Sequence, residues 1–220
     1  MAFSESAVQS GLEKLNDNSN IWVAYSGGMD SHVLLHLMVR LLPSQERRLR
    51  ALHINHGISP HAADWQSHCQ QTCSDLGIPF QAVSVSLDAD GTDSLETRAR
   101  KARYRVFADR LGPGDYLFLA HHLDDQIETM LFRLLRGTGL KGLAGMPVSR
   151  PLGAGQLYRP LLALARDELE QYAIEHRLQW IEDDSNARAD YDRNYLRLKV
   201  LPLLEKRWPG YKNNWLRTAQ

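Results

Sequence analysis

An apolar run, a pair of glycines and an amphipathic run follow one another between residues 21 and 41, and this succession constrains the fold more than any other feature. Residues 21–25 are short, β-branched and aromatic, as in a buried strand. Apolar residues then recur at helical spacing until Pro43 ends the pattern. Gly27 and Gly28 allow a sharp turn between the two elements. The sequence therefore predicts a strand, a tight loop and a helix whose first amide groups favour an anion such as phosphate.

The polar residues of this loop distinguish it from the common phosphate-binding loop. That loop needs a lysine to reach the outer phosphates, and residues 26–31 contain none. They contain Asp30 instead, and a carboxylate beside phosphates is repulsive unless a cation such as Mg²⁺ lies between them. The alternative is an ordinary turn with a helix cap. The order of strand, glycines, acid, serine and helix favours a metal–nucleotide site.

The loop resembles the S-G-G-x-D-S pyrophosphatase loop of the N-type ATP pyrophosphatases, the PP-loop superfamily. These enzymes cleave ATP to AMP and pyrophosphate while they activate a substrate as an adenylate. The resemblance implies that the loop binds the pyrophosphate end of ATP and that Asp30 holds Mg²⁺. The implied ATP-binding residues of the loop are Ser26, Gly27, Gly28, Met29, Asp30 and Ser31, with Met29 at the variable position.

The rest of the chain alternates between strand-like and helix-like patterns. Strands are expected over residues 49–55, 80–87, 116–120 and 180–182, with residues 158–162 extended. Helices are expected over residues 4–15, 60–76, 95–110, 127–134 and 166–176, and from residue 195 onward. This alternation predicts an α/β fold, a doubly wound parallel sheet with helices on both faces. The resemblance adds that the sheet is Rossmann-like, of the adenine nucleotide alpha hydrolase type.

Polar and imidazole side chains stand at the ends of the expected strands, where ligands bind in sheets of this kind. His53 and Asn55 close one strand and His121 follows another. His53 and Asn55 are candidates for contacts with the nucleotide, although a histidine at a strand end is often hydrogen-bonded structure. A glycine-rich segment, residues 137–145, is either an ordinary loop or a mobile lid over this crevice.

A cluster of acids follows the apolar strand at residues 116–120. His121, Asp125 and Glu128 are expected to line one face of the next helix, as candidate catalytic residues. Carboxylates there can hold Mg²⁺ or the ammonium group of an amine substrate, whereas zinc would need more ligands than this run supplies. The alternative is a helix cap with solvated acids. Five hydrogen-bonding or charged groups directly after an apolar strand favour a site.

Basic residues gather in one segment although the formal net charge of the chain is +0. Arg98, Lys101 and Arg105 recur at helical spacing between residues 96 and 110, in a helix that Asp93 is expected to cap. They are candidates for contacts with RNA or with the phosphates of ATP. The alternative is a solvated helix face.

Cysteine use and hydropathy indicate a protein of the reducing cytoplasm. Cys69 and Cys73 lie four residues apart in a helical pattern, which suits buried inert thiols better than a C-x-x-C redox or iron–sulfur site. No apolar run approaches the length of a membrane span. We therefore expect no association with a membrane.

Further motifs resemble those of the tRNA(Ile)-lysidine synthetases, a bacterial tRNA-modifying family of the superfamily. The pattern A-H-H-x-D-D-Q-x-E-T matches residues 120–129 at every fixed position, and E-T-x-A-R-x-x-R-Y matches residues 96–104. Other matches are R-G-T-G-x-x-G-L-x-G-M at residues 136–146, R-P-L-L at 159–162, D-x-S-N at 183–186 and R-N-x-x-R at 193–197. Through these matches Arg136, Arg193 and Arg197 become candidates for binding RNA or substrate.

The resemblance implies an enzyme that joins free L-lysine to the wobble cytidine of the isoleucine tRNA with a CAU anticodon. ATP would adenylate the cytidine with release of pyrophosphate, and the side-chain amine of lysine would then displace AMP to give lysidine. Residues 1–188 would form the catalytic domain, and residues 189–220 a helical segment that leads to a missing C-terminal tRNA-binding region. The oligomeric state stays open, a homodimer being one option. Two alternatives are a tRNA thiolase of the same superfamily, which would need a reactive cysteine near the crevice, and an ATP-binding module without turnover.

Overall fold

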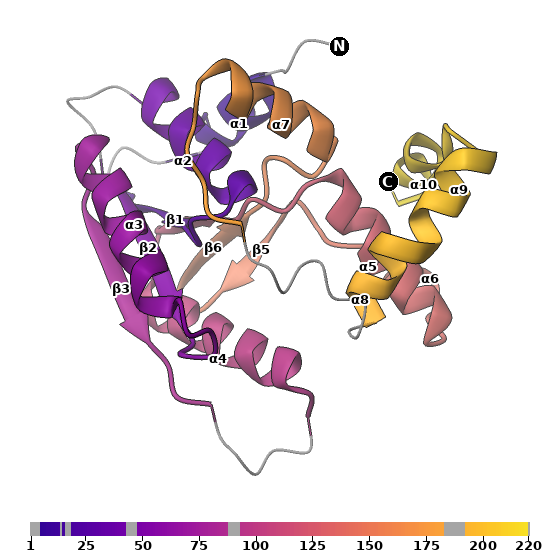
Figure 1. Cartoon of the computed structure of the whole chain (residues 1–220), viewed down its shortest axis with the longest axis horizontal. Coiled ribbons are helices and arrows are strands. Elements are labelled where there is room, and N and C mark those ends of the chain that lie inside the picture. Colours follow the sequence, from indigo (N-terminus) through magenta and orange to yellow (C-terminus); the bar gives the residue numbers. More distant parts are fainter. Residues whose placement is uncertain are drawn as a thin grey trace.

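The computed structural model describes residues 5–13, 15, 19–42, 48–87, 93–182 and 192–219 (Figure 1). They form a six-stranded sheet in the order β3-β2-β1-β4-β6-β5. The strands are β1 (Ile21–Ala24), β2 (Leu49–Asn55), β3 (Phe80–Ser84), β4 (Tyr116–Phe118), β5 (Ser149–Leu152) and β6 (Gly155–Tyr158). The helices are α1 (Ser6–Leu12), α2 (Met29–Leu41), α3 (Ala62–Asp75), α4 (Leu95–Arg110), α5 (Leu123–Leu135), α6 (Leu140–Leu143), α7 (Arg166–Glu175), α8 (Asp192–Tyr195), α9 (Leu201–Arg207) and α10 (Tyr211–Ala219), with a π-helical segment η3 (Leu196–Val200) between α8 and α9.

The order of the strands reverses at β1. From β1 the chain moves outward to β2 and β3, and it then returns to β4 on the other side of β1, with all of these strands parallel. In a doubly wound sheet, ligands bind outside the carboxyl ends of the two strands at which the order reverses. The segments that follow β1 and β4 therefore lie next to each other and form the expected crevice.

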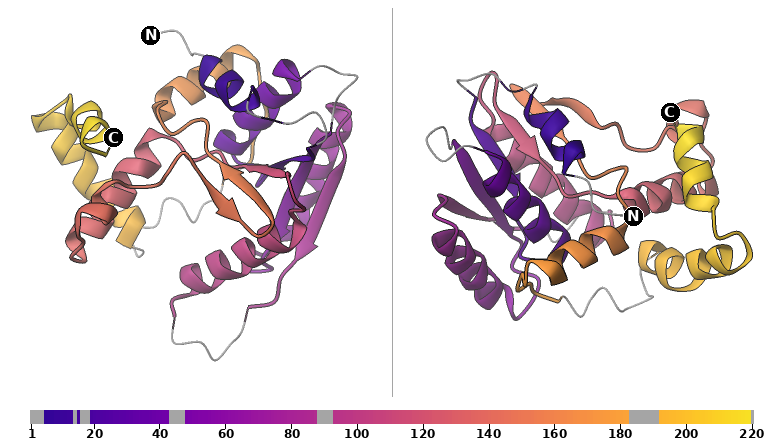
Figure 2. Two further views of the ribbon diagram at one scale, coloured as in Figure 1. Left: turned by 180° about the vertical axis from the view of Figure 1, so that it is seen from behind. Right: turned by 90° about the horizontal axis from the view of Figure 1, so that it is seen from above.

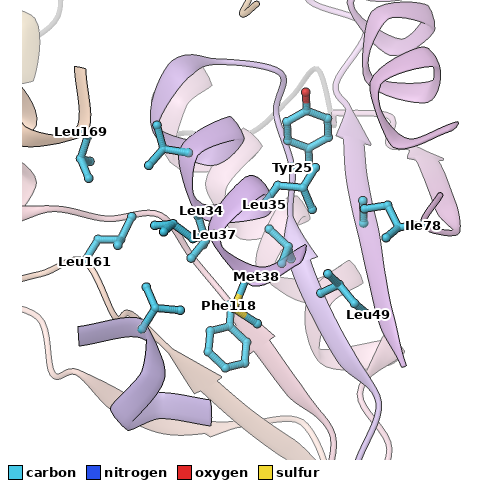
Figure 3. Packing of buried hydrophobic residues seen from close by; sticks show 14 of the residues in the cluster. Tyr25, Leu34, Leu35, Leu37, Met38, Leu49, Ile78, Phe118, Leu161 and Leu169 are labelled. Atoms are coloured by element: carbon cyan, nitrogen blue, oxygen red, sulfur yellow. The ribbon is translucent and has the colours of Figure 1, made fainter. Parts of the chain in front are cut away.

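The two faces of the sheet are covered by different helices. Along β1, Ile21 and Val23 pack into a core with α2 and α7, whereas Trp22 packs into a second core with Phe107 of α4. This alternation is the period of two that a strand buried on both faces requires. Figure 3 shows the first core, in which Met38 of α2 lies beside Phe118 of β4. The predicted α/β sheet with helices on both faces is confirmed.

The C-terminal helices pack on α5 rather than on the sheet. Leu123, Ile127 and Leu131 of α5 form a third core with Leu196 of η3 and Tyr211 of α10. Both views of Figure 2 show these helices (yellow) beside α5. Residues 192–219 thus reach the carboxyl-end side of the sheet and are able to contribute side chains to the crevice. No helix in the part of the chain that the structure describes is long and apolar enough to cross a membrane.

One prediction about the second half of the sheet is wrong, and one pair of strands was not predicted. β5 and β6 form an antiparallel hairpin that the sequence did not reveal, because the strands are short and Pro151 argues against a strand; an edge strand tolerates proline. Residues 180–182 form no strand. The backbone N–H of Ile181 instead donates to the carbonyl oxygen of Gly27 (2.9 Å), so this segment supports the loop after β1.

The N-terminus of α4 also differs from its prediction. Ser94 caps the helix, its hydroxyl accepting a hydrogen bond from the backbone N–H of Thr97 (3.3 Å). Asp93 lies one residue too early to cap the helix and pairs with Lys101 instead (2.5 Å). The glycine-rich segment contains the short helix α6, which the sequence analysis did not predict.

The hairpin turn gives a test of this architecture. Gly153 has φ +56, and an added Cβ would overlap the carbonyl oxygen of Ala108 in α4, whereas Gly114 has φ +82 with open space around it. Alanine in the left-handed region costs about 1–2 kcal/mol at either position. We expect Gly153→Ala to lower the free energy of unfolding by about 1–3 kcal/mol more than Gly114→Ala, because the hairpin must also move away from α4. Urea denaturation measures the difference, and equal losses would contradict the packing of the hairpin on α4.

Candidate active site

The loop between β1 and α2 is held in shape by its own serines. The Ser31 hydroxyl donates to the carbonyl oxygen of Gly28 (2.9 Å) and accepts a hydrogen bond from the backbone N–H of Ser26 (3.2 Å). The hydroxyl of Ser26 lies 3.1 Å from that of Ser31. Gly28 is the N-cap of α2 and offers no side-chain cap, so no side chain of its own covers the first amide groups of the helix. These amides are suited to bind phosphate oxygens.

The rear of the loop leaves no room for a side chain at Gly27. This residue has φ +88, and an added Cβ would lie 2.8 Å from Ile181 Cδ1 and 2.9 Å from Cys69 Sγ. Cys69 and Cys73 are buried free thiols, and burial raises the pKa of each to about 12. Both thiols are therefore protonated and unreactive at neutral pH, as the sequence analysis expected.

His122 joins the loop after β1 to the segment after β4. Its Nε2 atom lies 3.6 Å from Asp30 Oδ2 and 3.5 Å from Asp125 Oδ2, and its side chain is only 4% exposed. Burial alone would lower the pKa of His122, but its hydrogen bond with Asp30 and the charge of Asp125 outweigh burial and raise it. The carboxylates thus favour the charged form of the imidazole, which offsets part of the negative charge that they concentrate here.

Asp30 fits the expected role as a magnesium ligand. Its Oδ1 atom is buried and has no hydrogen-bond partner among the described residues. Among the described residues, no group of three His, Cys, Asp or Glu side chains has the arrangement to hold a metal ion by itself. Mg²⁺ is commonly held by one or two carboxylates together with substrate phosphates, so a single free carboxylate oxygen beside a phosphate loop suits it.

The first acids of α5 are partly engaged in structure. Asp125 Oδ2 accepts a hydrogen bond from the backbone N–H of His122 (3.1 Å), which caps the helix. Asp124 accepts hydrogen bonds from Lys212 Nζ of α10 (2.7 Å) and from the backbone N–H of Arg166 (2.9 Å). Asp124 therefore ties α5 to α7 and α10, whereas Oδ1 of Asp125 stays near the crevice, 3.8 Å from Arg197.

Glu128 and Arg197 form a two-bond ion pair. Arg197 donates from Nε to Oε1 of Glu128 (2.5 Å) and from an Nη to Oε2 (2.8 Å). The Glu128 side chain is 3% exposed. Burial raises the pKa of Glu128, and Arg197 offsets only part of that effect. The pair thus brings the R-N-x-x-R segment onto the acidic run, and the binding of RNA or substrate by Arg197 stays a prediction.

His121 lies on the other side of this acidic group. We expected it to share a helix face with Asp125 and Glu128, but α5 begins at Leu123, so His121 lies outside the helix and that part of the prediction is wrong. Its Nδ1 atom accepts a hydrogen bond from Nε of Arg159 (3.2 Å). Burial, followed by the charge of Arg159, holds the pKa of His121 well below its usual value. His121 is therefore neutral, with its proton on Nε2.

Sequence reasoning missed His122, and one signal could have found it. Residues just after a strand keep its alternation, so His121 and His122 face opposite sides. His122 then shares the side of Asp30, and His121 the side of the arginines. This distinction depends on where α5 begins, which the pattern of apolar residues did not determine.

The basic residues of α4 divide into two groups. Lys101 and Arg105, two of the predicted RNA-binding residues, are exposed, and Lys101 pairs with Asp93; Arg98 is half-buried. Arg100 and Arg103, which the sequence analysis did not single out, lie instead around Tyr104 on the inner side of the helix. The contact of the predicted residues with RNA stays a prediction.

Arg136 and Arg193 meet at one pocket. It has a volume of about 370 Å³, and its lining includes Arg100, Arg133 and Phe132. The guanidinium groups of Arg136 and Arg193 lie 5.1 and 5.9 Å from the centre of the Phe132 ring. The R-G-T-G and R-N-x-x-R segments, distant in sequence, are thus neighbours in space.

His53 and Asn55 make structural contacts. Nδ1 of His53 lies 3.0 Å from the carbonyl oxygen of Tyr25, and burial lowers the pKa of this histidine. Asn55 donates to Gln66 (3.1 Å) and accepts a hydrogen bond from the backbone N–H of Gly57 (2.9 Å). Both side chains support the crevice, and their contact with a nucleotide stays a prediction.

The glycine-rich segment is anchored to α5 at its C-terminal end. The Gln126 side chain donates to the carbonyl oxygen of Met146 (3.0 Å) and accepts from its N–H (2.6 Å). Arg133 donates to the carbonyl oxygens of Gly142 (3.2 Å) and Gly145 (2.7 Å). These bonds favour the ordinary loop over the mobile lid for this part of the segment.

Comparison with known proteins identifies the class to which this fold and loop belong. Residues 3–204 match the family model of the PP-loop domain, and the chain therefore belongs to that family. The resemblance drawn from the loop motif is confirmed. The match also supports the use of ATP by this domain.

Relatives that match most of this chain include several proteins named tRNA(Ile)-lysidine synthase. The protein of Coxiella burnetii is 52% identical over 198 residues, which are 90% of this chain and 44% of that protein. The protein of Pseudomonas aeruginosa is 54% identical over 188 residues, 85% of this chain and 42% of that protein. The chain thus spans less than half the length of these relatives.

Solved structures share the fold. The U34-tRNA thiolase NcsA from Methanococcus maripaludis has a TM-score of 0.77 at 21% sequence identity, covering 98% of this chain and 76% of that one. The NMN synthetase from Francisella tularensis has a TM-score of 0.54 at 13% identity, covering 99% and 97%. At these identities the similarity shows the shared fold alone.

The ion pair of Glu128 and Arg197 generates a pH-dependent prediction. Folding raises the pKa of Glu128. The titration of this residue therefore contributes to the free energy of unfolding at low pH, and this contribution is lost as the pH rises through the folded-state pKa. Arg197→Ala should raise that pKa further and lower the free energy of unfolding by about 1–3 kcal/mol near neutral pH. The partial exposure of Arg197 keeps the loss below that of a fully buried pair. The deficit relative to wild type should shrink at about pH 4.

Denaturant unfolding of Arg197→Ala at both pH values measures this effect. Arg166→Ala is the control, because it removes an exposed pair with Glu170 at 4.0 Å and should cost about 0–1 kcal/mol. A deficit for Arg197→Ala that is the same at both pH values would contradict the assigned state of Glu128.

Proposed function

We propose that this chain is the catalytic part of a tRNA(Ile)-lysidine synthetase, which ligates lysine to the wobble cytidine of an isoleucine tRNA through an adenylated cytidine. The observation that carries the proposal is the contact of His122 with both Asp30 and Asp125. It brings a phosphate loop and a group of amine-binding acids together at the reversal point of the sheet. The names of the relatives supply the substrate class.

The loop after β1 would bind the pyrophosphate end of ATP. The first amides of α2, with Ser26 and Ser31, would donate to phosphate oxygens. Asp30 would hold Mg²⁺. When bound, this ion supplies positive charge that offsets the negative charge developing on the leaving pyrophosphate. Protonated His122 keeps Asp30 oriented toward the crevice and reduces the repulsion between the carboxylate and the phosphates.

Asp125 and Glu128 would bind the ammonium group of lysine. They lie one turn apart on α5, and Arg197 fixes Glu128 in place. Lysine must lose a proton before its amine attacks the adenylated cytidine. Asp125 is the better candidate to accept that proton, because both oxygens of Glu128 are occupied by Arg197.

The two alternatives are less well supported. A thiolase needs a reactive sulfur near the crevice, but burial raises the pKa of Cys69 and Cys73 to about 12. These are the two cysteines of the chain. A passive ATP sensor needs no group of acids beside its phosphate loop. The placement of Asp125 and Glu128 therefore favours an enzyme.

Asp30→Ala tests the phosphate loop. We expect it to reduce pyrophosphate release by a factor of about 10² or more, because the carboxylate that would hold Mg²⁺ is lost, and to leave the fold intact. Asp64→Ala is the matched control, since Asp64 occupies the first turn of α3 as Asp30 occupies that of α2, and it is exposed. Near-normal pyrophosphate release by Asp30→Ala in Mg²⁺ would exclude this role.

Asp125→Asn tests the lysine site. We expect the KM for lysine to rise about tenfold or more while the KM for ATP changes little, because lysine is the one of the two substrates that Asp125 would contact. Glu128→Gln should act in the same direction. Initial rates at varied lysine and varied ATP separate the two constants. Equal increases in both would assign these acids to the metal or to structure.

A further inference from the structure

Four arginines surround the side chain of Tyr104. The guanidinium of Arg100 lies 4.8 Å from the ring centre, that of Arg150 lies 5.3 Å away and that of Arg103 lies 6.0 Å away. Arg100 and Arg159 also donate to the phenolic oxygen, at 3.3 and 3.5 Å. These residues come from α4, from β5 and from the end of β6. The arrangement therefore depends on the tertiary fold and is not a solvated helix face.

The positive charge of this Tyr104 cluster is not compensated. No ion pair within 4.0 Å joins its four arginines to a carboxylate of the described residues. Arg159 is only 3% exposed, and its bonds go to neutral acceptors, namely His121, Tyr104 and the carbonyl oxygen of Pro147. Nε of Arg103 is buried and has no hydrogen-bond partner in the described part of the chain. Burying cations in this way is costly unless an anion binds them.

The pocket beside Phe132 extends the cluster. Arg100 belongs to both, and the pocket adds Arg133, Arg136 and Arg193. Planar guanidinium groups match phosphate oxygens in paired hydrogen bonds and also stack on nucleobases. A volume of about 370 Å³ suits a nucleoside-sized group. The arginines suited to a phosphate and the pocket suited to a base thus adjoin each other at Arg100.

The Tyr104 cluster lies on the opposite face of the sheet from the helix that follows the ATP loop. Its centre, Tyr104, packs with Phe107 in the core under α4, whereas α2 belongs to the core on the other face. His121 contacts the cluster through Arg159, and its neighbour His122 contacts Asp30. The crevice therefore has a cationic side and a carboxylate side, separated by two consecutive histidines.

We propose that Arg100, Arg103, Arg150 and Arg159 around Tyr104 form a second phosphate site, which holds a backbone phosphate of the substrate RNA beside the reacting nucleotide. The adjoining pocket at Phe132 receives the neighbouring nucleotide. The proposal rests on the proposed function in that the RNA is the substrate. A phosphate of ATP is the other ligand that the same four arginines suit. The position of the cluster away from the N-terminus of α2 favours the RNA.

Arg150→Gln tests the second phosphate site. Arg150 is on the edge strand β5 and is half-buried, so the variant should fold. The probe is a synthetic anticodon stem–loop of the isoleucine tRNA, titrated at several salt concentrations. We expect its affinity to fall several-fold, and the slope of log K against log salt to become shallower by about 0.7, as for one lost phosphate contact to single-stranded RNA. Affinity for ATP should be unchanged.

Arg50→Gln is the matched control. Arg50 also lies over an aromatic ring, at 5.6 Å from Trp22, but at the amino end of β2 and far from the crevice. Arg50→Gln removes the same charge as Arg150→Gln and should leave the slope of log K against log salt unchanged. Tyr104→Phe, which removes the phenolic hydroxyl and keeps the ring, should weaken RNA binding in the same direction as Arg150→Gln.

Two results would overturn the second phosphate site. One is an unchanged salt slope in Arg150→Gln with a lower affinity for ATP, which would assign the cluster to the nucleotide. The other is an equal change in Arg50→Gln, which would mean that only bulk charge is measured. Lysine incorporation by the wild-type protein is measured separately. If it is absent while the difference in slope persists, the proposed function fails and the phosphate site stands.

Discussion

The contact of His122 with Asp30 and Asp125 is the interaction on which the site depends. It connects the two chain segments at the reversal point of the sheet, at 3.6 and 3.5 Å. Without a cation there, the carboxylates would repel each other and the phosphates of a nucleotide. The histidine can serve because it is buried and caps α5, so its position is fixed by the helix rather than by the ligand.

The pKa values of two consecutive histidines shift in opposite directions because the sheet presents them to different surroundings. Among carboxylates the pKa of His122 is raised, and among arginines the pKa of His121 falls well below its usual value. The charged form is therefore favoured for the histidine on the carboxylate side and the neutral form for the histidine on the cationic side.

Local features of the sequence predicted well, and features that depend on distant segments did not. The strand, loop and helix around Gly27 follow from residues in one stretch, as does the alternation that makes the sheet parallel. The β5–β6 hairpin did not follow, because the strands are short and Pro151 argues against a strand unless it lies at an edge. Arg100 and Arg103 were passed over for Arg98, Lys101 and Arg105, since helical spacing alone does not show which side of α4 faces β5 and β6.

The most direct test of the account is the nucleoside that forms in the tRNA. The isoleucine tRNA is incubated with the protein, ATP, Mg²⁺ and isotopically labelled lysine, then digested and analysed by mass spectrometry. The account predicts that the wobble cytidine is replaced by a nucleoside that carries the labelled lysine, with AMP and pyrophosphate released in equal amounts. A sulfur-containing nucleoside, or pyrophosphate release without any change in the tRNA, would contradict it.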